Sequence, residues 1–379
     1  MSGSYKLSEE QDMIRAMARQ IAKNKLAPRA AEIDKVGEFP WDVIEIYRQN
    51  NILGMPIPVE YGGQGADTLS CHLLIEEFAT ECANSAHALA DHWLGCHPLE
   101  IACSEEQKKR IFPMLTEKLV AFSITEPEAG SDVGNIKTQA VLKGDHYILN
   151  GTKCFCTDGA VADFISIFAK TDPNAGAHGI SVFFVDKSFP GISVGKIEDQ
   201  MGMRGTHACD IILEDCAVPK ENRIGEEGEG FSIAMRTLDL SRPIDAALAL
   251  GIAQGALNYS KEYAKHRVQF GKPIAEFQGI QFMLADMAME IEAARHLIYR
   301  AVSLIDEGAT DPMISAMSNC FATDVAMKVT TNAIQILGGY GYMRDHPVER
   351  MFRDAKLMQI VEGTNEIQRI VIARNLLRR

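Results

Sequence analysis

Near its C-terminus the sequence reads Val361-Glu-Gly-Thr-Asn-Glu-Ile-Gln-Arg369, which is its most informative stretch. A lone carboxylate, Glu362, stands directly before Gly363 and Thr364, at the start of a helix predicted over residues 365–377. Glycine lets the backbone approach a ligand closely, threonine caps helices, and free amides at a helix start bind oxyanions. This combination suits removal of a proton alpha to a thioester carbonyl. A surface glutamate before a helix cap is the alternative.

Composition and charge narrow the class of protein. Of the 379 residues, 46% are hydrophobic and 23% are charged, as in an ordinary soluble protein long enough for two or three domains. The net charge of −13 argues against a nucleic-acid partner or an anionic membrane. No apolar run approaches the length of a membrane span, and no leader pattern opens the chain. We therefore expect a cytoplasmic protein without membrane insertion.

The nine cysteines are expected to be reduced residues of the core. Cys154 and Cys156 are close enough in sequence to suggest a metal site. However, they flank Phe155 in an expected strand, and no second Cys or His pair follows at zinc spacing. We therefore predict no metal site.

Three regions with different residue patterns indicate the fold. Residues 1–121 carry apolar positions at helical spacing. Residues 122–230 contain short β-branched and aromatic runs between Gly, Asp and Asn turns, as in a small antiparallel barrel or sandwich. Residues 231–379 form long Ala-, Met- and Leu-rich helical segments, typical of a four-helix bundle. The predicted fold is α+β and multi-domain, with an N-terminal α-helical domain, a middle β domain and a C-terminal helical bundle.

Five segments in order resemble the acyl-CoA dehydrogenases, FAD enzymes that oxidise acyl-CoA thioesters between the alpha and beta carbons. Besides residues 361–369 they are Phe122-Ser-Ile-Thr-Glu-Pro-Glu-Ala-Gly-Ser-Asp132, Gly151-Thr-Lys-Cys-Phe-Cys-Thr-Asp-Gly159, Arg267-Val-Gln-Phe-Gly-Lys-Pro273 and Gln335-Ile-Leu-Gly-Gly-Tyr-Gly-Tyr342. Matching motifs recur from about residue 7 to the end of the chain. The resemblance implies the family's fold, FAD as cofactor and an acyl-CoA substrate.

The resemblance assigns the flavin contacts. Thr125 and Ser131 would meet the pyrimidine side and the pyrophosphate, Thr157 would donate a hydrogen bond near N5, and Phe155 would cover the ring face away from substrate. Asp158 replaces a common asparagine. No Gly-x-Gly-x-x-Gly opens a βαβ unit, so a nicotinamide is not expected. The full cofactor-binding set is Phe122, Ile124, Thr125, Gly130, Ser131, Phe155, Thr157, Arg267, Gln269, Phe270, Gln278, Gln335, Gly338, Gly339, Thr364 and Glu366.

The segment around Arg267 pairs a cation with a glycine-containing turn, which suits a pyrophosphate. In the family this segment reaches the flavin of a neighbouring subunit, so the resemblance implies a homo-oligomer, a tetramer or at least a dimer. A solvated surface arginine is the alternative.

Leu238-Asp-Leu-Ser-Arg-Pro243 matches the family's substrate segment. Arg242 would meet a CoA phosphate or a pantetheine carbonyl, and Asp239 a pantetheine amide. Some relatives carry the catalytic glutamate where this chain has Ser241, and they lack the one at position 362. The substrate-binding set is Ser131, Asp239, Ser241, Arg242 and Gly363.

By the same resemblance, Glu362 is the catalytic base and flavin N5 accepts the hydride. The electrons then pass to an electron-transferring flavoprotein. Burial by substrate should raise the pKa of Glu362 from its reference value of about 4.3, so that the carboxylate can work near neutrality.

Asp91, His92 and Trp93 lie on a segment that floors the acyl pocket in the family, where a straight fatty chain needs an apolar surface. Asp91 is either solvated or paired with a histidine on the outer face, or it is a second catalytic carboxylate inside the pocket. In the second case it could deprotonate a carbon remote from the thioester, as in 1,4-elimination on a conjugated ring. With Trp93 shortening the pocket, this resembles the branch acting on cyclohexane- and cyclohexene-carboxyl-CoA. We expect a compact, cyclic acyl group.

Other activities stay open. The chain could be a short- or branched-chain acyl-CoA dehydrogenase, an enoyl-CoA reductase fed by reduced flavoprotein, or an oxidase that uses oxygen. A flavin- or CoA-binding relative without turnover is a further alternative, against which the presence of Glu362, Thr157 and Arg242 argues.

Overall fold

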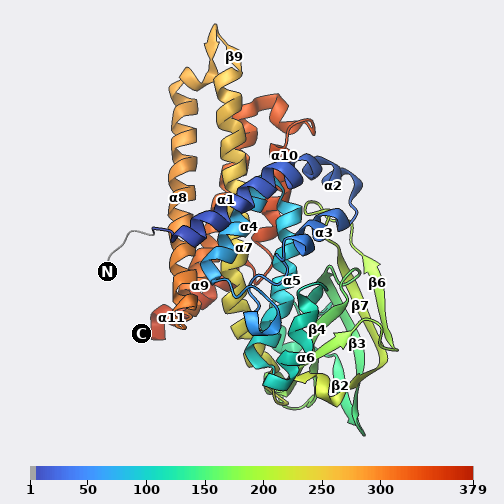
Figure 1. Cartoon of the computed structure of the whole chain (residues 1–379). Helices are drawn as coiled ribbons and strands as arrows, with labels where there is room; N and C mark the ends of the chain where they lie inside the picture. Colours follow the sequence, from blue (N-terminus) through green and yellow to red (C-terminus); the bar gives the residue numbers. More distant parts are fainter. Residues whose placement is uncertain (1–5, 379) are drawn as a thin grey trace.

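The computed structural model describes residues 6–378 and shows helices, then a β region, then helices along the chain (Figure 1). This order confirms the predicted fold class. The first five residues of the predicted segment 1–121 and the last residue of the predicted segment 231–379 lie outside the described residues.

Three of the N-terminal helices, the first, fourth and sixth, begin at residues whose side chains cap them. Ser8 accepts a hydrogen bond from the backbone of Gln11, whose side chain binds back to Ser8, and Asp67 caps the fourth helix in a similar way. The helices are α1 (Glu9–Ile21), α2 (Ala30–Val36), α3 (Trp41–Gln49), α4 (Thr68–Glu81), α5 (Ala83–Ala102) and α6 (Glu105–Leu115).

The middle region forms one eight-stranded sheet. Its order is β6-β7-β3-β2-β4-β5-β8, and β1 pairs with β4. Most pairs are antiparallel, but β1 and β2 each run parallel to β4. The strands are β1 (Val120–Ser123), β2 (Gln139–Lys143), β3 (His146–Thr157), β4 (Phe164–Lys170), β5 (Ile180–Asp186), β6 (Ile192–Ile197), β7 (Ala208–Pro219) and β8 (Arg223–Ile224).

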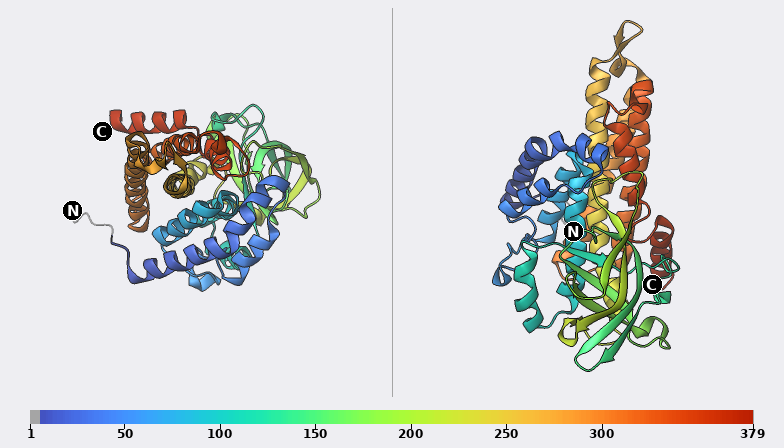
Figure 2. Two further views of the ribbon diagram at one scale, coloured as in Figure 1. Left: turned by 90° about the horizontal axis from the view of Figure 1, so that it is seen from above. Right: turned by 90° about the vertical axis from the view of Figure 1, so that its right-hand side faces the viewer.

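The C-terminal region is built around three long helices that stand side by side (Figures 1 and 2). A two-stranded hairpin between the first two of them forms one tip of the molecule (Figure 1). None of the helices within residues 6–378 is long and apolar enough to cross a membrane. The elements are α7 (Gly230–His266), β9 (Val268–Gln269), β10 (Lys272–Pro273), α8 (Gln278–Asp306), α9 (Pro312–Leu337), α10 (Val348–Met358) and α11 (Asn365–Arg378).

Helix α5 connects the three regions, because it packs against α7 in the bundle and against β1 and β4 in the sheet. Gly95 allows this close approach, since a Cβ atom there would lie 2.5 Å from the carbonyl oxygen of Val120. The hydroxyl of Ser166 donates to the Gly95 carbonyl oxygen at 2.9 Å and ties the helix to β4. The face of α5 toward α7 is therefore held in a fixed position.

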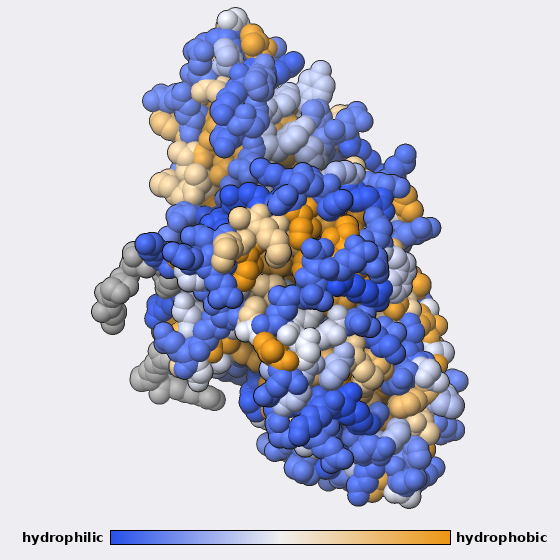
Figure 3. Space-filling view, viewed as in Figure 1, coloured by the Kyte–Doolittle hydropathy of each residue, from blue (hydrophilic) through white to orange (hydrophobic). Residues whose placement is uncertain are grey.

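The surface is mainly hydrophilic, but apolar side chains gather in the middle of the face on which α1 lies (Figure 3). Met13 and Met17 of α1 are both exposed. This part of α1 therefore differs from its acidic first turn, which holds Glu9, Glu10 and Asp12.

Candidate active site

Glu362 lies in a tight turn between α10 and α11. Its φ of 55° is in the left-handed region that residues with side chains rarely adopt, and Gly363 follows at 91°. The buried Gln368 stabilises the turn by donating to the carbonyl oxygens of Glu362 (3.0 Å) and Gly363 (2.7 Å). Thr364 accepts from the amide of Ile367, which confirms the predicted helix cap. An unfavourable backbone held by buried bonds is typical of functional sites.

The Glu362 carboxylate turns inward to α7, where the hydroxyl of Ser241 donates to its Oε2 atom at 2.5 Å. Burial raises the pKa of Glu362, while the Ser241 bond and the charges of Arg242 and His97 lower it, and the net shift is upward. A carboxylate with a raised pKa is suited to accept a proton near neutral pH.

Arg242 is buried, unlike an arginine that binds a phosphate at the surface of a protein. Only 3% of it is exposed, and it donates to Asp239 at 2.6 Å. Burial lowers the pKa of Arg242, although the charges of Asp239 and Glu362 oppose this shift. Its Nε atom is buried and finds no partner within residues 6–378. This burial does not fit the CoA phosphate and leaves the pantetheine carbonyl as the predicted contact.

Three acids act electrostatically on Asp91 of α5, namely Asp158 after β3, Asp245 of α7 and Glu362, and we call these four residues the carboxyl cluster. Burial raises the pKa of Asp91 and Asp245 well above the usual range, and that of Asp158 to about 7. The charges of Asp158, Asp245 and Glu362 raise the pKa of Asp91 further. Because like charges disfavour joint ionisation, the four carboxyl groups are not all ionised together at neutral pH.

Asp91 is largely buried, since 13% of its side chain is exposed, so a pair with a histidine and a second catalytic carboxylate are the two interpretations that remain. Its Oδ2 atom lies 3.4 Å from Nδ1 of His87. Burial lowers the pKa of His87 to about 4, so this histidine is neutral. Trp93 does not shorten an acyl pocket as predicted, because it lies in the core and donates to the carbonyl oxygen of Leu53. Asp91 and Trp93 are two positions apart on α5, and side chains at that spacing on a helix point in different directions.

The predicted flavin contacts lie on an exposed face formed by β3 and the loop after β1. Phe155 has a φ of 52° at a register shift between β3 and β7, a bulge that directs its ring outward, and it is 64% exposed. Thr125 lies beside this strand, since its carbonyl oxygen accepts from the amide of Cys154. We call Thr125, Gly130, Ser131, Phe155 and Thr157 the flavin face.

A buried ion pair fixes the loop that carries the flavin face. The Lys153 ammonium donates to Glu126 at 2.7 Å and to the carbonyl oxygen of Ile124. The amides of Lys137 and Thr138 also donate to Glu126. Burial lowers the pKa of Lys153 to about 8, and the charge of Glu126 opposes this shift. These contacts join both ends of residues 124–138 to β3.

The residues of the flavin face fit a flat aromatic cofactor. Phe155 offers an exposed ring for stacking, and open space surrounds the Cα of Gly130 on the neighbouring loop. Ser131 is exposed on that loop, Thr157 is half-buried on β3, and Ile124 packs in the core beneath. Phe155, Thr157, Thr125 and Ser131 would therefore hold the isoalloxazine end of FAD.

The predicted adenosine contacts lie elsewhere. Arg267, Gln269, Gly338 and Gly339 line one cavity of about 480 Å³, and the Arg267 guanidinium stacks on Tyr340 at 5.3 Å. Gln278 and Gln335 are exposed outside its lining, and Phe270 at the hairpin tip is 95% exposed. The hairpin is at the opposite end of the molecule from the sheet (Figure 1). Glu366 is exposed at the start of α11.

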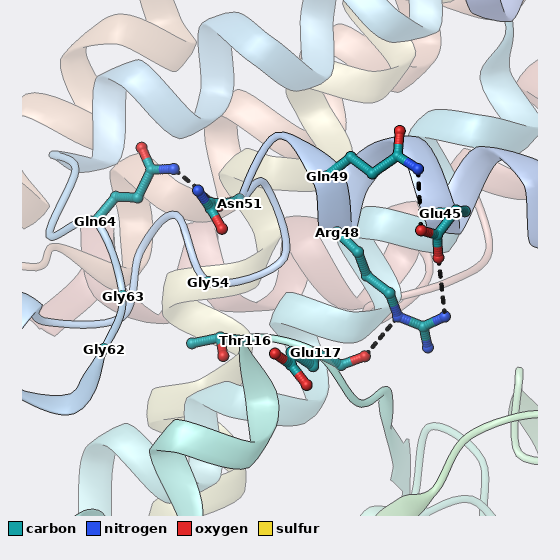
Figure 4. Close-up of a pocket in the computed structure, with 10 residues that line it drawn as sticks. All are labelled: Glu45, Arg48, Gln49, Asn51, Gly54, Gly62, Gly63, Gln64, Thr116 and Glu117. Carbon is teal, nitrogen blue, oxygen red and sulfur yellow. Dashed lines mark hydrogen bonds and ion pairs between the residues drawn. The ribbon is translucent and has the colours of Figure 1, made fainter.

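Another cavity, of about 510 Å³, lies between α3, the glycine-rich turn after it and the end of α6 (Figure 4). Arg48 crosses it and donates to the carbonyl oxygen of Glu117. None of the residues predicted for the site lines this cavity. Within residues 6–378, no three His, Cys, Asp or Glu side chains are grouped to hold a metal ion.

Three features of the site were not predicted from the sequence: Asp245, His97, and the pair of Glu126 and Lys153. Asp245 stands out as an acid in the otherwise apolar run Ile244-Asp-Ala-Ala-Leu248, one turn after Ser241. This spacing is the signal that could have identified it.

Three family models match the chain in order. They are the N-terminal, middle and C-terminal domains of acyl-CoA dehydrogenase, over residues 8–118, 121–216 and 228–377. The short-chain specific acyl-CoA dehydrogenase of Clostridium acetobutylicum is 45% identical over 377 residues, covering 99% of this chain and 100% of the relative. The cyclohexane-1-carbonyl-CoA dehydrogenase of Geobacter metallireducens is 45% identical over 378 residues, covering 99% of each.

A solved structure of butyryl-CoA dehydrogenase from Megasphaera elsdenii superposes with a TM-score of 0.96 at 43% identity, covering 99% of this chain and 100% of that chain. These matches confirm the family and the cofactor predicted from the sequence. The chain belongs to the acyl-CoA dehydrogenase family of FAD-dependent oxidoreductases.

Proposed function

We propose that this acyl-CoA dehydrogenase acts on a compact, cyclic acyl-CoA thioester, such as cyclohexane- or cyclohex-1-ene-1-carboxyl-CoA, with Glu362 as the base. The observation that carries the proposal is the carboxyl cluster, in which the buried Asp91 of α5 and the Ser241-bound Glu362 act on one another electrostatically. A buried acid would not stabilise the binding of a straight apolar acyl group, because burying an unpaired polar group costs free energy. The similarity to a cyclohexane-1-carbonyl-CoA dehydrogenase supports this choice of substrate.

In the proposed reaction the ionised Glu362 removes the alpha proton of the thioester. Its backbone N–H would donate to the thioester oxygen, where negative charge develops, and such preorganised donors are a large source of catalysis. FAD, when bound, supplies the electron sink that accepts the hydride from the beta carbon. Ser241 and Arg242 keep Glu362 ionised before the proton moves, because both lower its pKa.

Asp91 is proposed as the second base, for a proton remote from the thioester. Its pKa is raised well above the usual range by burial and then by its three acidic neighbours. While Glu362 is protonated, one of these negative charges is gone, so ionisation of Asp91 becomes easier. Each oxidation removes one electron pair, so 1,4-elimination on the ring would take place in a second turnover, after the first electron pair has passed to the proposed electron-transferring flavoprotein.

We further propose that the protein works as a homo-oligomer, a tetramer or at least a dimer. The flavin face and the Arg267 cavity lie at different ends of one chain (Figure 1), so two copies are needed for both to contact the same FAD. An electron-transferring flavoprotein is the proposed acceptor of the electrons. All nine cysteines are free and buried, as expected for the reducing cytoplasm.

A short straight-chain substrate is the second candidate, because the relatives include a short-chain specific enzyme and a butyryl-CoA dehydrogenase. A panel of straight, branched and cyclic acyl-CoA esters, followed by anaerobic bleaching of the flavin, separates the two candidates. We expect the highest kcat/KM with a six-membered ring ester. Bleaching by butyryl-CoA with no response to any ring ester would contradict the cyclic substrate.

A further inference from the structure

Asp245 is a buried acid for which the proposed reaction has no use. It lies on α7 one turn after Ser241, and only 7% of it is exposed. Its Oδ2 atom finds no hydrogen-bond partner within the described part of the chain. Buried polar atoms are nearly always hydrogen-bonded in native proteins, so an unpaired carboxyl oxygen in the interior is a candidate for contact with a ligand.

The position of Asp245 indicates which ligand group could contact it. Residues four apart share one face of a helix, so Asp245 lies on the side of α7 from which Ser241 binds Glu362. Across from it, α5 packs against α7 and contributes Asp91, whose Oδ2 atom makes no hydrogen bond within residues 6–378 and lies 3.4 Å from Nδ1 of His87. The charge of Glu362 acts on Asp245 and raises its pKa further. Asp245 would therefore lie on the side of α7 that faces the acyl group in the proposed reaction.

We propose that Asp245 binds a hydroxyl group on the acyl moiety, so that the preferred substrates are hydroxylated ring thioesters. The inference rests on the proposed function, because it requires a compact ring held between Glu362 and α7. A hydroxyl group can both donate and accept, so it pairs with a carboxyl group in either protonation state. A site with buried polar groups for a substrate hydroxyl rejects the analogue that lacks it.

Binding without turnover tests the inference most cleanly. In a Glu362→Gln background, calorimetry compares cyclohexane-carboxyl-CoA with its 3-hydroxy and 4-hydroxy derivatives. We expect at least one hydroxylated ester to bind about 10- to 100-fold more tightly, the range set by one satisfied buried hydrogen bond. Adding Asp245→Val should abolish the preference. Asp245→Asn should keep it, because an amide also bonds a hydroxyl.

Asp354 provides the matched control. It is a buried acid of α10, 1% exposed, that accepts from the Met203 amide at 2.7 Å. Asp354→Asn should leave the ratio of affinities unchanged. Equal affinity for plain and hydroxylated esters, or a preference that survives Asp245→Val, would overturn the inference.

Flavin bleaching by the unaltered enzyme shows which claim has failed. If the plain ring ester is oxidised and no hydroxyl preference is found, only the role of Asp245 is wrong. If straight-chain esters are oxidised and every ring ester is refused, both the cyclic substrate and the role of Asp245 are wrong.

Discussion

The carboxyl cluster and the flavin face differ in how much of each site a single chain supplies. The cluster is buried and joined by α5, α7 and the turn before α11, so Glu362 already has its hydrogen-bond donor in place. The flavin face is open, with Phe155 64% exposed, and its predicted adenosine partners lie at the other end of the molecule. The proposed acid-base groups are thus preorganised within the chain, whereas the proposed cofactor site is completed by FAD and, in the proposed oligomer, by a second copy.

Removing the carboxylate of Glu362 should have the largest effect on activity. It should impair the carboxyl cluster and leave the flavin face unchanged. We expect Glu362→Gln to lower the rate of flavin bleaching by acyl-CoA by about 10³- to 10⁴-fold, as the loss of general base catalysis does. The flavin face is untouched by this change, so the purified variant should remain yellow. Anaerobic stopped-flow absorbance measures both quantities, and unchanged bleaching would remove Glu362 from its role.

Breaking the ion pair beneath the flavin face should affect folding and cofactor retention instead. Lys153→Met leaves Glu126 buried without its cation, which we expect to cost about 3–5 kcal/mol of unfolding free energy. Urea denaturation measures the loss, and FAD content after gel filtration should fall in parallel. The double variant Lys153→Met/Glu126→Gln should recover part of the stability. A single variant as stable as the parent would show that the loop is held by other contacts.

Within the cluster, Asp91→Asn should act on one class of substrate. We expect turnover of a cyclohexene thioester to fall by about 100-fold, while turnover of butyryl-CoA, which needs Glu362 alone, falls much less. Because burial and neighbouring charges raise the pKa of Asp91, ring oxidation in the parent should increase toward alkaline pH. Equal losses on both substrates would make Asp91 a structural residue.

Ser241→Ala should have the smallest effect. The Ser241 hydroxyl lowers the pKa of Glu362, so its removal raises that pKa further. Since the base must be ionised, the acidic limb of the pH profile of kcat/KM should move to higher pH, with a loss below tenfold on the alkaline plateau. A profile shifted to lower pH would contradict the hydrogen bond to Glu362.

Local patterns predicted the turn that carries Glu362, the proposed base, because its signals are local. The Glu-Gly-Thr segment predicted both the glycine turn and the Thr364 cap. The helices, strands and their order followed from hydrophobic periodicity. Asp245 was missed because an acid in an Ala- and Leu-rich helix can face solvent or the interior, and its place one turn after Ser241 indicates the inner face only once Ser241 is known to bind Glu362.

Tertiary packing also explains where two side chains lie. Trp93 was expected in the acyl pocket, but its indole faces the loop after α3, on the far side of α5 from Asp91. Arg242 was expected at a CoA phosphate or a pantetheine carbonyl; the salt bridge to Asp239 holds it in the interior, and the contact with the pantetheine carbonyl stays a prediction. In both cases the direction of the side chain depended on which helix face was buried.

The most direct test of the central claim is a crystal structure of the Glu362→Gln variant with FAD and a ring acyl-CoA ester. The account predicts that the side chain at position 362 lies within van der Waals contact of the alpha carbon, on the opposite side of the acyl group from the isoalloxazine ring. It would be contradicted if that side chain points into solvent, or if the flavin face holds no ring.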